Sequence, residues 1–269
     1  MRLAVLFSGG KDSCAALWIA QSSGHEVACL LTLESENPAS YMFHTPNINL
    51  TRLQAQAAAI PILMRKTKGE KEEELKDLHA ILAEAKRTYR IEGIATGAIA
   101  SAYQATRVQQ ACAKLGLWVF NPLWQRDQAE HLRELIGAGF EIVVSGVAAY
   151  PLDDTWLGRR MDEAALAELE LLQRRYGLSP AGEGGELETL VLWAPGWRKR
   201  LVIKEAVKEY ENHAGTWHVK RAELESVREG AGQGAHSSNA GNEAAARALG
   251  RRSGSPAPKH LKSGKNTPP

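Results

Sequence analysis

The chain has 269 residues, of which 44% are hydrophobic and 24% charged, so it is long enough to bury one large core or two modest ones. Its formal net charge is +2, but the segment from Glu229 to the end holds six Lys/Arg and two acidic residues and so carries +4, which leaves −2 on the rest. That balance gives no electrostatic case for a face that grips nucleic acid, so the composition shows no strong nucleic-acid signal.

Cysteine usage and hydropathy favour a cytoplasmic protein. The three cysteines, Cys14, Cys29 and Cys112, lie far apart and show neither a disulfide framework nor a metal-ligand spacing, so we expect reduced core thiols. No apolar run approaches the roughly 18 residues of a membrane span, so we expect no membrane partner. Met1–Phe7 is short and runs into a Gly-rich loop, which favours a buried strand over a signal peptide.

Strand-like and helix-like segments alternate over residues 1–123, which is the pattern of a parallel sheet with crossover helices. The expected strands are Leu3–Phe7, Val27–Leu33, Ile60–Met64 and Ile94–Thr96. The expected helices are Cys14–Gln21, Leu50–Ala59, Glu70–Arg87 and Gln104–Leu115. The fold class predicted is therefore α/β, with a Rossmann-like parallel sheet.

Residues 124–228 mix elements without a regular βα alternation, and we interpret them as a smaller α+β domain that completes the site. The expected elements are a strand at Ile142–Val147, a helix at Asp162–Tyr176, and strands at Leu190–Trp193 and Leu201–Ile203. Residues 229–269 are rich in Gly, Ser, Ala, Asn and Pro and cannot bury enough apolar surface to fold. They are predicted to form a disordered basic tail.

A six-residue string lies between the first strand and the first helix, where a phosphate-binding loop must be. Its residues are Ser8, Gly9, Gly10, Lys11, Asp12 and Ser13. Two glycines let the backbone turn sharply and bring its N–H groups against phosphate oxygens, and the helix that follows presents its positive N-terminus. Lys11 adds a charge and the serines add donors. Asp12 either caps the helix or helps to hold Mg²⁺.

This string differs from a Walker A loop, which needs a Gly, four residues, then Gly-Lys-Ser/Thr. It resembles the PP-loop of the ATP pyrophosphatases, a group with the HUP/PP-loop type of sheet. That resemblance implies that ATP is cleaved between its α and β phosphates, with AMP and pyrophosphate as products. Lys11 would then stabilise the charge that builds on the leaving pyrophosphate.

Two further motifs follow the second and fourth expected strands, where ligands bind in open α/β sheets. They are Tyr41–Asn47 and Gly97–Gln104 with Arg107-Val108 after it, and a third motif is Gly182–Thr189. Together they resemble the diphthine–ammonia ligase family, over Met1 to about Glu225. The nucleotide-site candidates that follow are His44, Gly97, Tyr103, Gln104 and Arg107. The alternative for His44 is a polar loop residue, and for Arg107 a solvated helix charge.

Glu183, Glu186 and Glu188 stand among three glycines, and such a loop would not concentrate carboxylates without a ligand. In the family that the chain resembles, the substrate is diphthine on translation elongation factor 2, a modified histidine with a trimethylammonium group and a free carboxylate. The carboxylates suit that cation or an incoming ammonium ion, so all three, with Lys11, are catalytic candidates. Trp156 or Tyr150 would add a cation–π face.

The resemblance implies a two-step ligation in which Mg·ATP adenylates the diphthine carboxylate and ammonium supplies the nitrogen. Ala102 and Gln109 stand where the family usually has acidic residues, which puts one polar contact in doubt. Three rivals stay open: a PP-loop enzyme that acts on another carboxylate such as a corrinoid side chain, one that acts on tRNA, and a nonhydrolysing nucleotide-binding module. The oligomeric state stays open too, with a homodimer among the candidates.

Overall fold

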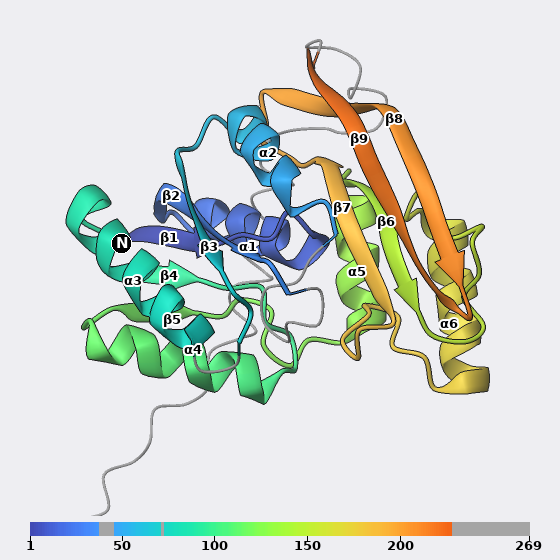
Figure 1. Ribbon diagram of the computed structural model, residues 1–269, viewed down its shortest axis with the longest axis horizontal. Coiled ribbons are helices and arrows are strands. Elements are labelled where there is room, and N and C mark those ends of the chain that lie inside the picture. The colour runs from blue at the N-terminus through green and yellow to red at the C-terminus, as the bar shows by residue number, and fades with distance from the viewer. Residues whose placement is uncertain (38–45, 71–72, 228–269) are drawn as a thin grey trace, which may run out of the picture.

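The computed structural model describes residues 1–37, 46–70 and 73–227, and within them two sheets lie side by side (Figure 1). The first sheet is parallel, in the order β3-β2-β1-β4-β5. Its strands are β1 (Arg2–Leu6), β2 (Glu26–Ser35), β3 (Ile62–Thr67), β4 (Gly93–Ala95) and β5 (Trp118–Phe120). The strand order reverses at β1, between β2 and β4, so the carboxyl ends of β1 and β4 form the crevice where such sheets bind ligands. The predicted Rossmann-like sheet is confirmed.

Helices cover both faces of this sheet. The helices in this part of the chain are α1 (Lys11–Ser22), α2 (Thr51–Ala58) with the short η1 (Ile48–Leu50) before it, α3 (Glu73–Tyr89) and α4 (Ala102–Lys114). Of these, α1, α3 and α4 contact the strands of the parallel sheet, whereas α2 packs against the second sheet, described below. The apolar stripe of α3, with Leu78 and Leu82, joins Val108 and Cys112 of α4 in a core on one face. The other face packs on α1. Each strand is thus buried between helices, which explains why the expected strands are short apolar runs.

The second sheet is antiparallel, in the order β7-β6-β9-β8. Its strands are β6 (Glu141–Ala148), β7 (Leu187–Trp193), β8 (Lys199–Glu211) and β9 (Ala214–Ser226), and two helices accompany it, α5 (Gln128–Gly137) and α6 (Glu163–Tyr176). The pairing of β6 with β7 shifts register between Val144 and Gly146, which face Thr189 and Glu188 of β7. Ser145 is thus the extra residue of a β-bulge.

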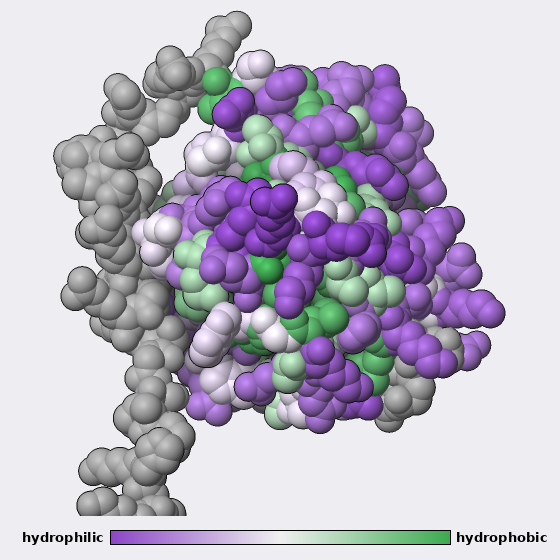
Figure 2. Space-filling view, turned by 90° about the vertical axis from the view of Figure 1, so that its left-hand side faces the viewer, coloured by the Kyte–Doolittle hydropathy of each residue, from purple (hydrophilic) through white to green (hydrophobic). Residues whose placement is uncertain are grey.

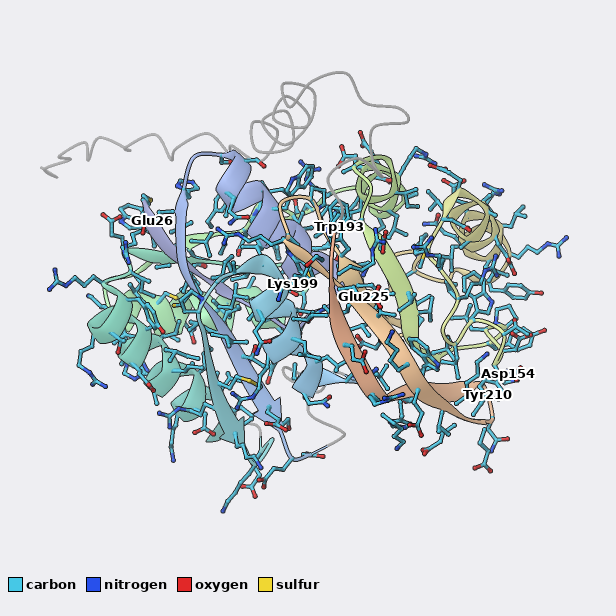
Figure 3. All side chains as sticks on the ribbon, turned by 90° about the horizontal axis from the view of Figure 1, so that it is seen from above. Glu26, Asp154, Trp193, Lys199, Tyr210 and Glu225 are labelled. Carbon is cyan, nitrogen blue, oxygen red and sulfur yellow. The ribbon has the colours of Figure 1, made fainter. Side chains whose placement is uncertain are left out.

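The β8–β9 hairpin is much longer than the strand expected at Leu201–Ile203. In Figure 3 Lys199 and Glu225 mark one end of this hairpin, and Tyr210 marks the other, beside Asp154. The Tyr210 hydroxyl donates to the carbonyl of Leu152 at 3.1 Å, which fixes this second end on the loop after β6. Both strands carry many exposed charged residues and alternate little between apolar and polar, so hydropathy alone did not reveal their length.

A single core runs from the first sheet through α1 into the second sheet. Trp18 of α1 meets Phe140, just before β6, edge to face with ring centroids 5.6 Å apart. The sheets therefore pack on each other through α1. The domain division at residue 123 stays a prediction, and the tail from residue 229 lies outside the described residues.

The three cysteines are free and buried, as expected. Burial raises the pKa of the Cys29 and Cys112 thiols to about 12, so neither thiol ionises near neutral pH.

The side of the molecule where α3 lies is mostly hydrophilic, with scattered apolar residues (Figure 2). Among the described residues, no helix combines the length and the apolar character that a membrane crossing would require.

Candidate active site

A cavity of about 1260 Å³ lies at the carboxyl ends of β1 and β4. Three stretches of chain supply most of its lining, within residues 6–13, 96–108 and 181–189. The first two follow strands of the parallel sheet, whereas the third leads into β7 of the other sheet. The volume exceeds the range of about 300–1,000 Å³ that is usual for a single small-molecule ligand. The cavity therefore has room for a nucleotide and a second reactant together.

The two glycines of the phosphate loop lie in close contact with α2 and β7, and Gly9 leaves no room for a side chain. Gly9 has a φ of +80°, and a Cβ there would stand 2.1 Å from the Oε1 atom of Gln54. A Cβ on Gly10 would stand 3.2 Å from the carbonyl oxygen of Thr189. Gln54 of α2 is fully buried, and its Nε2 donates to the carbonyls of Gly9 and Val191, both at 2.8 Å. The loop is thus held between α2 and β7.

The second sheet also caps the helix that follows the loop. Gly10 takes the N-cap position of α1 and has no side chain to cap it. Instead, the Thr189 hydroxyl accepts a hydrogen bond from the Lys11 N–H at 3.1 Å, and the Val191 N–H donates to the Gly9 carbonyl at 3.0 Å. A side-chain cap is typically worth about 1 kcal/mol. The phosphate loop therefore depends on β7 for its shape.

The two serines of the loop bond within the loop. The Ser13 hydroxyl donates to the Gly10 carbonyl at 3.0 Å and accepts from the Ser8 N–H at 3.3 Å. These bonds close the turn that carries the glycines. Both serines line the cavity, as the sequence predicts for donors near a phosphate.

Lys11, Asp12 and His131 form a buried chain of polar contacts. The Lys11 side chain has an exposed fraction of 4%, and its Nζ donates to Asp12 Oδ2 at 2.8 Å and to the Ala181 carbonyl at 2.5 Å. The other oxygen of Asp12 lies 3.1 Å from Nε2 of His131, a residue of α5 that is 1% exposed. Burial favours the neutral acid, but the Lys11 charge and the hydrogen bond with His131 outweigh it and lower the pKa of Asp12. Asp12 is therefore ionised, and His131 must donate.

Gly97, at the start of the loop after β4, touches the first turn of α1. A Cβ on Gly97 would stand 2.6 Å from the carbonyl carbon of Asp12 and 2.8 Å from the Ser13 nitrogen. Distances below 3.0 Å to backbone atoms require a shift of one of the two segments. The close approach explains why the motif begins with glycine.

Gly97→Ala should weaken ATP binding about tenfold or more, because the methyl group would displace the turn that presents the phosphate-binding N–H groups. Titration calorimetry with ATP measures this. The matched control is Gly137→Ala at the end of α5, where the added methyl group meets open space and the helix should be unaffected or slightly more stable. Equal ATP affinity in wild type and Gly97→Ala would contradict the assigned role.

Three further nucleotide-site candidates, Tyr103, Gln104 and Arg107, lie on α4. Ser101 caps this helix by accepting from the Gln104 N–H at 3.3 Å, and Tyr103 and Gln104 both line the cavity. The Arg107 guanidinium stacks over the Tyr103 ring, 3.7 Å from its centroid. Arg107 thus orients a residue of the cavity wall. His44 lies outside the described residues.

The three acidic residues of the Gly-rich loop have different surroundings. The Glu183 carboxylate lines the cavity and accepts from the Ala100 N–H at 3.1 Å, which joins the loop to the one after β4. The Glu186 carboxylate accepts from the N–H groups of Ser179 and Gly184, at 3.3 and 2.8 Å, and so supports its own loop. Glu188, on β7, lines the cavity.

Burial governs the ionisation of two of these carboxyls. It raises the pKa of Glu183, and the Asp12 charge adds to that rise. It raises the pKa of Glu188 to about 7, although the nearby Lys11 charge acts in the opposite direction. A carboxyl group that changes charge near neutral pH can exchange protons with a reactant.

The expected cation–π face does not hold for Trp156. Its side chain is buried in the core, and the Arg159 guanidinium already lies over its ring at 4.3 Å. Tyr150 is 59% exposed, and its ring meets that of Tyr176 edge to face at 5.3 Å.

The site contains polar residues that sequence reasoning did not single out. Gln54 of α2 and His131 of α5 bind the phosphate loop. Gln128 of α5 accepts a hydrogen bond from the N–H of Ala181, just before the Gly182–Thr189 motif. One signal was available: Asp127 and Glu130 form a helix-start pattern, and His131 then falls on the same helix face as the buried Leu135. A polar residue on an apolar stripe marks a buried contact.

Within the described parts of the chain, no three or more His, Cys, Asp or Glu side chains gather in a way that could hold a metal ion. Mg²⁺ in ATP-using enzymes is held mainly by phosphates and by one or two carboxylates. Asp12 fits this need, because it is ionised, lies in the loop itself, and has an exposed side-chain fraction of 24%.

Comparisons with known proteins agree with this geometry. Residues 1–119 match the family model for the diphthamide synthase N-terminal domain, and residues 127–224 match that for the diphthamide synthase C-terminal domain. Diphthine–ammonia ligase from Rattus norvegicus is 37% identical over 222 residues, and the one from Homo sapiens 35%, with 76% of this chain and 83% of each relative covered. The Schizosaccharomyces pombe relative of the same name is 34% identical over 230 residues, covering 80% of this chain and 38% of that protein.

Among solved structures, a predicted subunit of tRNA methyltransferase from Methanocaldococcus jannaschii is 17% identical, with a TM-score of 0.37, over 72% of this chain and 98% of that one. We draw no conclusion from a match at this level. The two family models, in contrast, cover both sheets and the cavity between them. The chain therefore belongs to the diphthamide synthase family, that of the diphthine–ammonia ligases.

Proposed function

We propose that the protein joins ammonia to the carboxylate of diphthine on translation elongation factor 2, and that it uses ATP to activate that carboxylate. The observation that carries the proposal is one cavity lined by two kinds of group. The glycine loop with Lys11 supplies phosphate-binding groups, and Glu183 and Glu188 supply carboxyls to the same cavity. Family membership supports diphthine as the substrate, because the relatives compared above are named for it.

In the first step a carboxylate oxygen of diphthine attacks the α-phosphorus of ATP. The bond from that phosphorus to the bridging oxygen breaks, and pyrophosphate leaves with the electron pair. A carboxylate is a poor electrophile, whereas the acyl-adenylate carries AMP as a competent leaving group. Lys11 and the N–H groups at the start of α1 would stabilise the charge on the departing pyrophosphate.

In the second step ammonium gives a proton to the Glu188 carboxylate, and ammonia attacks the acyl carbon. The bond from this carbon to the AMP oxygen breaks, AMP leaves with the electron pair, and the amide nitrogen loses its extra proton to the AMP phosphate or to water. Ammonium cannot attack until it loses this proton, because it has no free electron pair. A base is most effective when its pKa is near the working pH, and burial raises the pKa of Glu188 to about 7. Glu188 is therefore our candidate for the base.

Glu183 and Glu186 receive separate roles in this scheme. Glu183 faces the cavity and would bind the trimethylammonium group or the ammonium ion. Glu186 accepts two backbone hydrogen bonds within its own loop, so we assign it to holding the loop that presents the other two. Mg²⁺ would bind together with the phosphates of ATP, with Asp12 as one of its ligands. It would neutralise part of the phosphate charge there.

The nucleotide products test the mechanism. We expect incubation with ATP, ammonium and diphthine-bearing elongation factor 2 to yield AMP and pyrophosphate, with the factor converted from carboxylate to amide. Chromatography identifies the nucleotides and mass spectrometry the modified factor, and a factor that lacks diphthine serves as the control. ADP as the main product would exclude adenylation.

The three rival functions have less support. An enzyme for a corrinoid carboxylate or for tRNA would lack its own substrate in this incubation and, like a nonhydrolysing module, would give neither AMP nor amidated factor. The same incubation therefore separates the proposed function from all three rivals. The relatives compared above share the name diphthine–ammonia ligase, which favours the factor as substrate.

A further inference from the structure

The ammonium group of Lys11 has two acceptors, and side chains of α5 bind the two residues that supply them. The first acceptor is Asp12 Oδ2, and His131 of α5 donates to the other oxygen of the same carboxylate at 3.1 Å. The second acceptor is the Ala181 carbonyl, and Gln128 Oε1 of α5 accepts from the N–H of Ala181 at 3.1 Å. Each contact of Lys11 thus continues into a side chain of one helix.

Gln128 and His131 are three residues apart, so they lie on the same face of α5, about one turn apart. The helix itself is firmly held. Asp127 caps it by accepting from the Glu130 N–H at 2.8 Å, and Leu132 and Leu135 are buried in the core that joins the two sheets. A rigid helix that fixes both acceptors also fixes the position of the cation between them.

We propose that Gln128 and His131 are positioning residues for adenylation, which set the Lys11 ammonium through Asp12 and the Ala181 carbonyl. The inference rests on the proposed function and adds to it a role for α5. Lys11 has four rotatable side-chain bonds, and its catalytic benefit depends on being aimed before the reaction. Asp12 alone would allow it to move, since Asp12 is partly exposed.

Two substitutions at position 131 separate positioning from packing. His131→Leu removes the donor but fills the buried space, and we expect it to lower the ligation rate at saturating ATP about tenfold to a hundredfold. His131→Gln supplies an amide donor near the position of Nε2 and should restore most of the rate. Gln128→Met, which removes the acceptor for the Ala181 N–H, should also lower the rate. Melting temperatures of all variants show whether each one folds.

A double-mutant cycle with Lys11 tests whether the two side chains of α5 act through the Lys11 ammonium. If α5 acts through Lys11, His131→Leu should change the rate less than twofold in a Lys11→Met background. His218→Gln is the matched control, because His218 also pairs with a carboxylate, Glu209 at 3.2 Å, but on the second sheet and outside the cavity lining, and it should leave the rate unchanged.

The same loss from His131→Leu in both backgrounds would overturn the proposal, since it would mean a general structural effect. So would a wild-type rate in His131→Leu, or failure of His131→Gln to restore the rate although the variant folds. Absence of ligation by the wild-type protein would instead refute the proposed function. The residual rates are read by mass spectrometry of elongation factor 2 after long incubation.

Discussion

Replacing Lys11 with Met should lower the ligation rate about a hundredfold to a thousandfold at saturating ATP. In the proposed mechanism Lys11 supplies a fixed charge beside the leaving pyrophosphate, and loss of one such donor typically costs this much. Methionine fills a similar volume, and His131 still binds Asp12, so we expect the protein to fold. Single-turnover measurement of AMP formation gives the rate of the step concerned.

The matched control is Lys204→Met. Lys204 also pairs with carboxylates, at 3.0 Å from Glu225 and 3.7 Å from Glu223, but on the outer hairpin of the second sheet. It should leave AMP formation unchanged. A normal rate in Lys11→Met would refute the assignment of the phosphate loop.

Glu188→Gln should remove one source of the pH dependence of kcat/KM for ammonium. In the wild type, kcat/KM for ammonium should rise with pH and level off above about 7, because only the ionised carboxylate accepts a proton. Ammonium titrates equally in both proteins, so the ratio of wild type to Glu188→Gln isolates this group. Initial rates over a pH series give the ratio, which should grow to about tenfold to a hundredfold, since a positioned base contributes at least that much.

The same substitution should stabilise the protein at high pH. The pKa of Glu188 is higher in the folded chain than the ordinary value of 4.5, so its contribution to stability is fully present below pH 4.5 and is lost as pH rises through about 7. Glutamine does not ionise, and at pH 8 the variant should be more stable by about 1 to 3 kcal/mol. Thermal unfolding measures this.

Glu168→Gln, a change on α6 where Glu168 pairs with Arg159, controls for loss of one carboxylate far from the cavity. It should alter neither the pH profile nor the pH dependence of stability in this range. If Glu188→Gln keeps the wild-type pH profile, another group removes the proton from ammonium.

The parts of the site that could be predicted from the sequence are those that local chain geometry determines. Gly9, Gly10 and Lys11 stand between an apolar strand and a helix, and this order alone implies a phosphate loop at a sheet edge. The parallel sheet follows in the same way, from alternating apolar runs and amphipathic segments. Both results depend on contacts between residues that are close in the chain.

The rest depends on contacts between distant residues. The sequence contains no sign that Thr189 caps a helix that starts at Lys11, because the two residues are 178 positions apart in the chain. Likewise, three acidic residues in one loop look equivalent until their partners are known: Glu186 binds the backbone, whereas Glu188 faces the cavity. The resemblance to a family located the loop, but only the tertiary arrangement distinguishes the surroundings of its three acidic residues.

The bulge at Ser145 lies opposite the peptide unit that links Glu188 to Thr189. Thr189 accepts the hydrogen bond from the amide that begins α1, and its neighbour Glu188 also lines the cavity. Strand β7 therefore links the phosphate loop directly to the carboxyl whose pKa is raised to about 7. A change of the β7 backbone at this bulge would alter both at once.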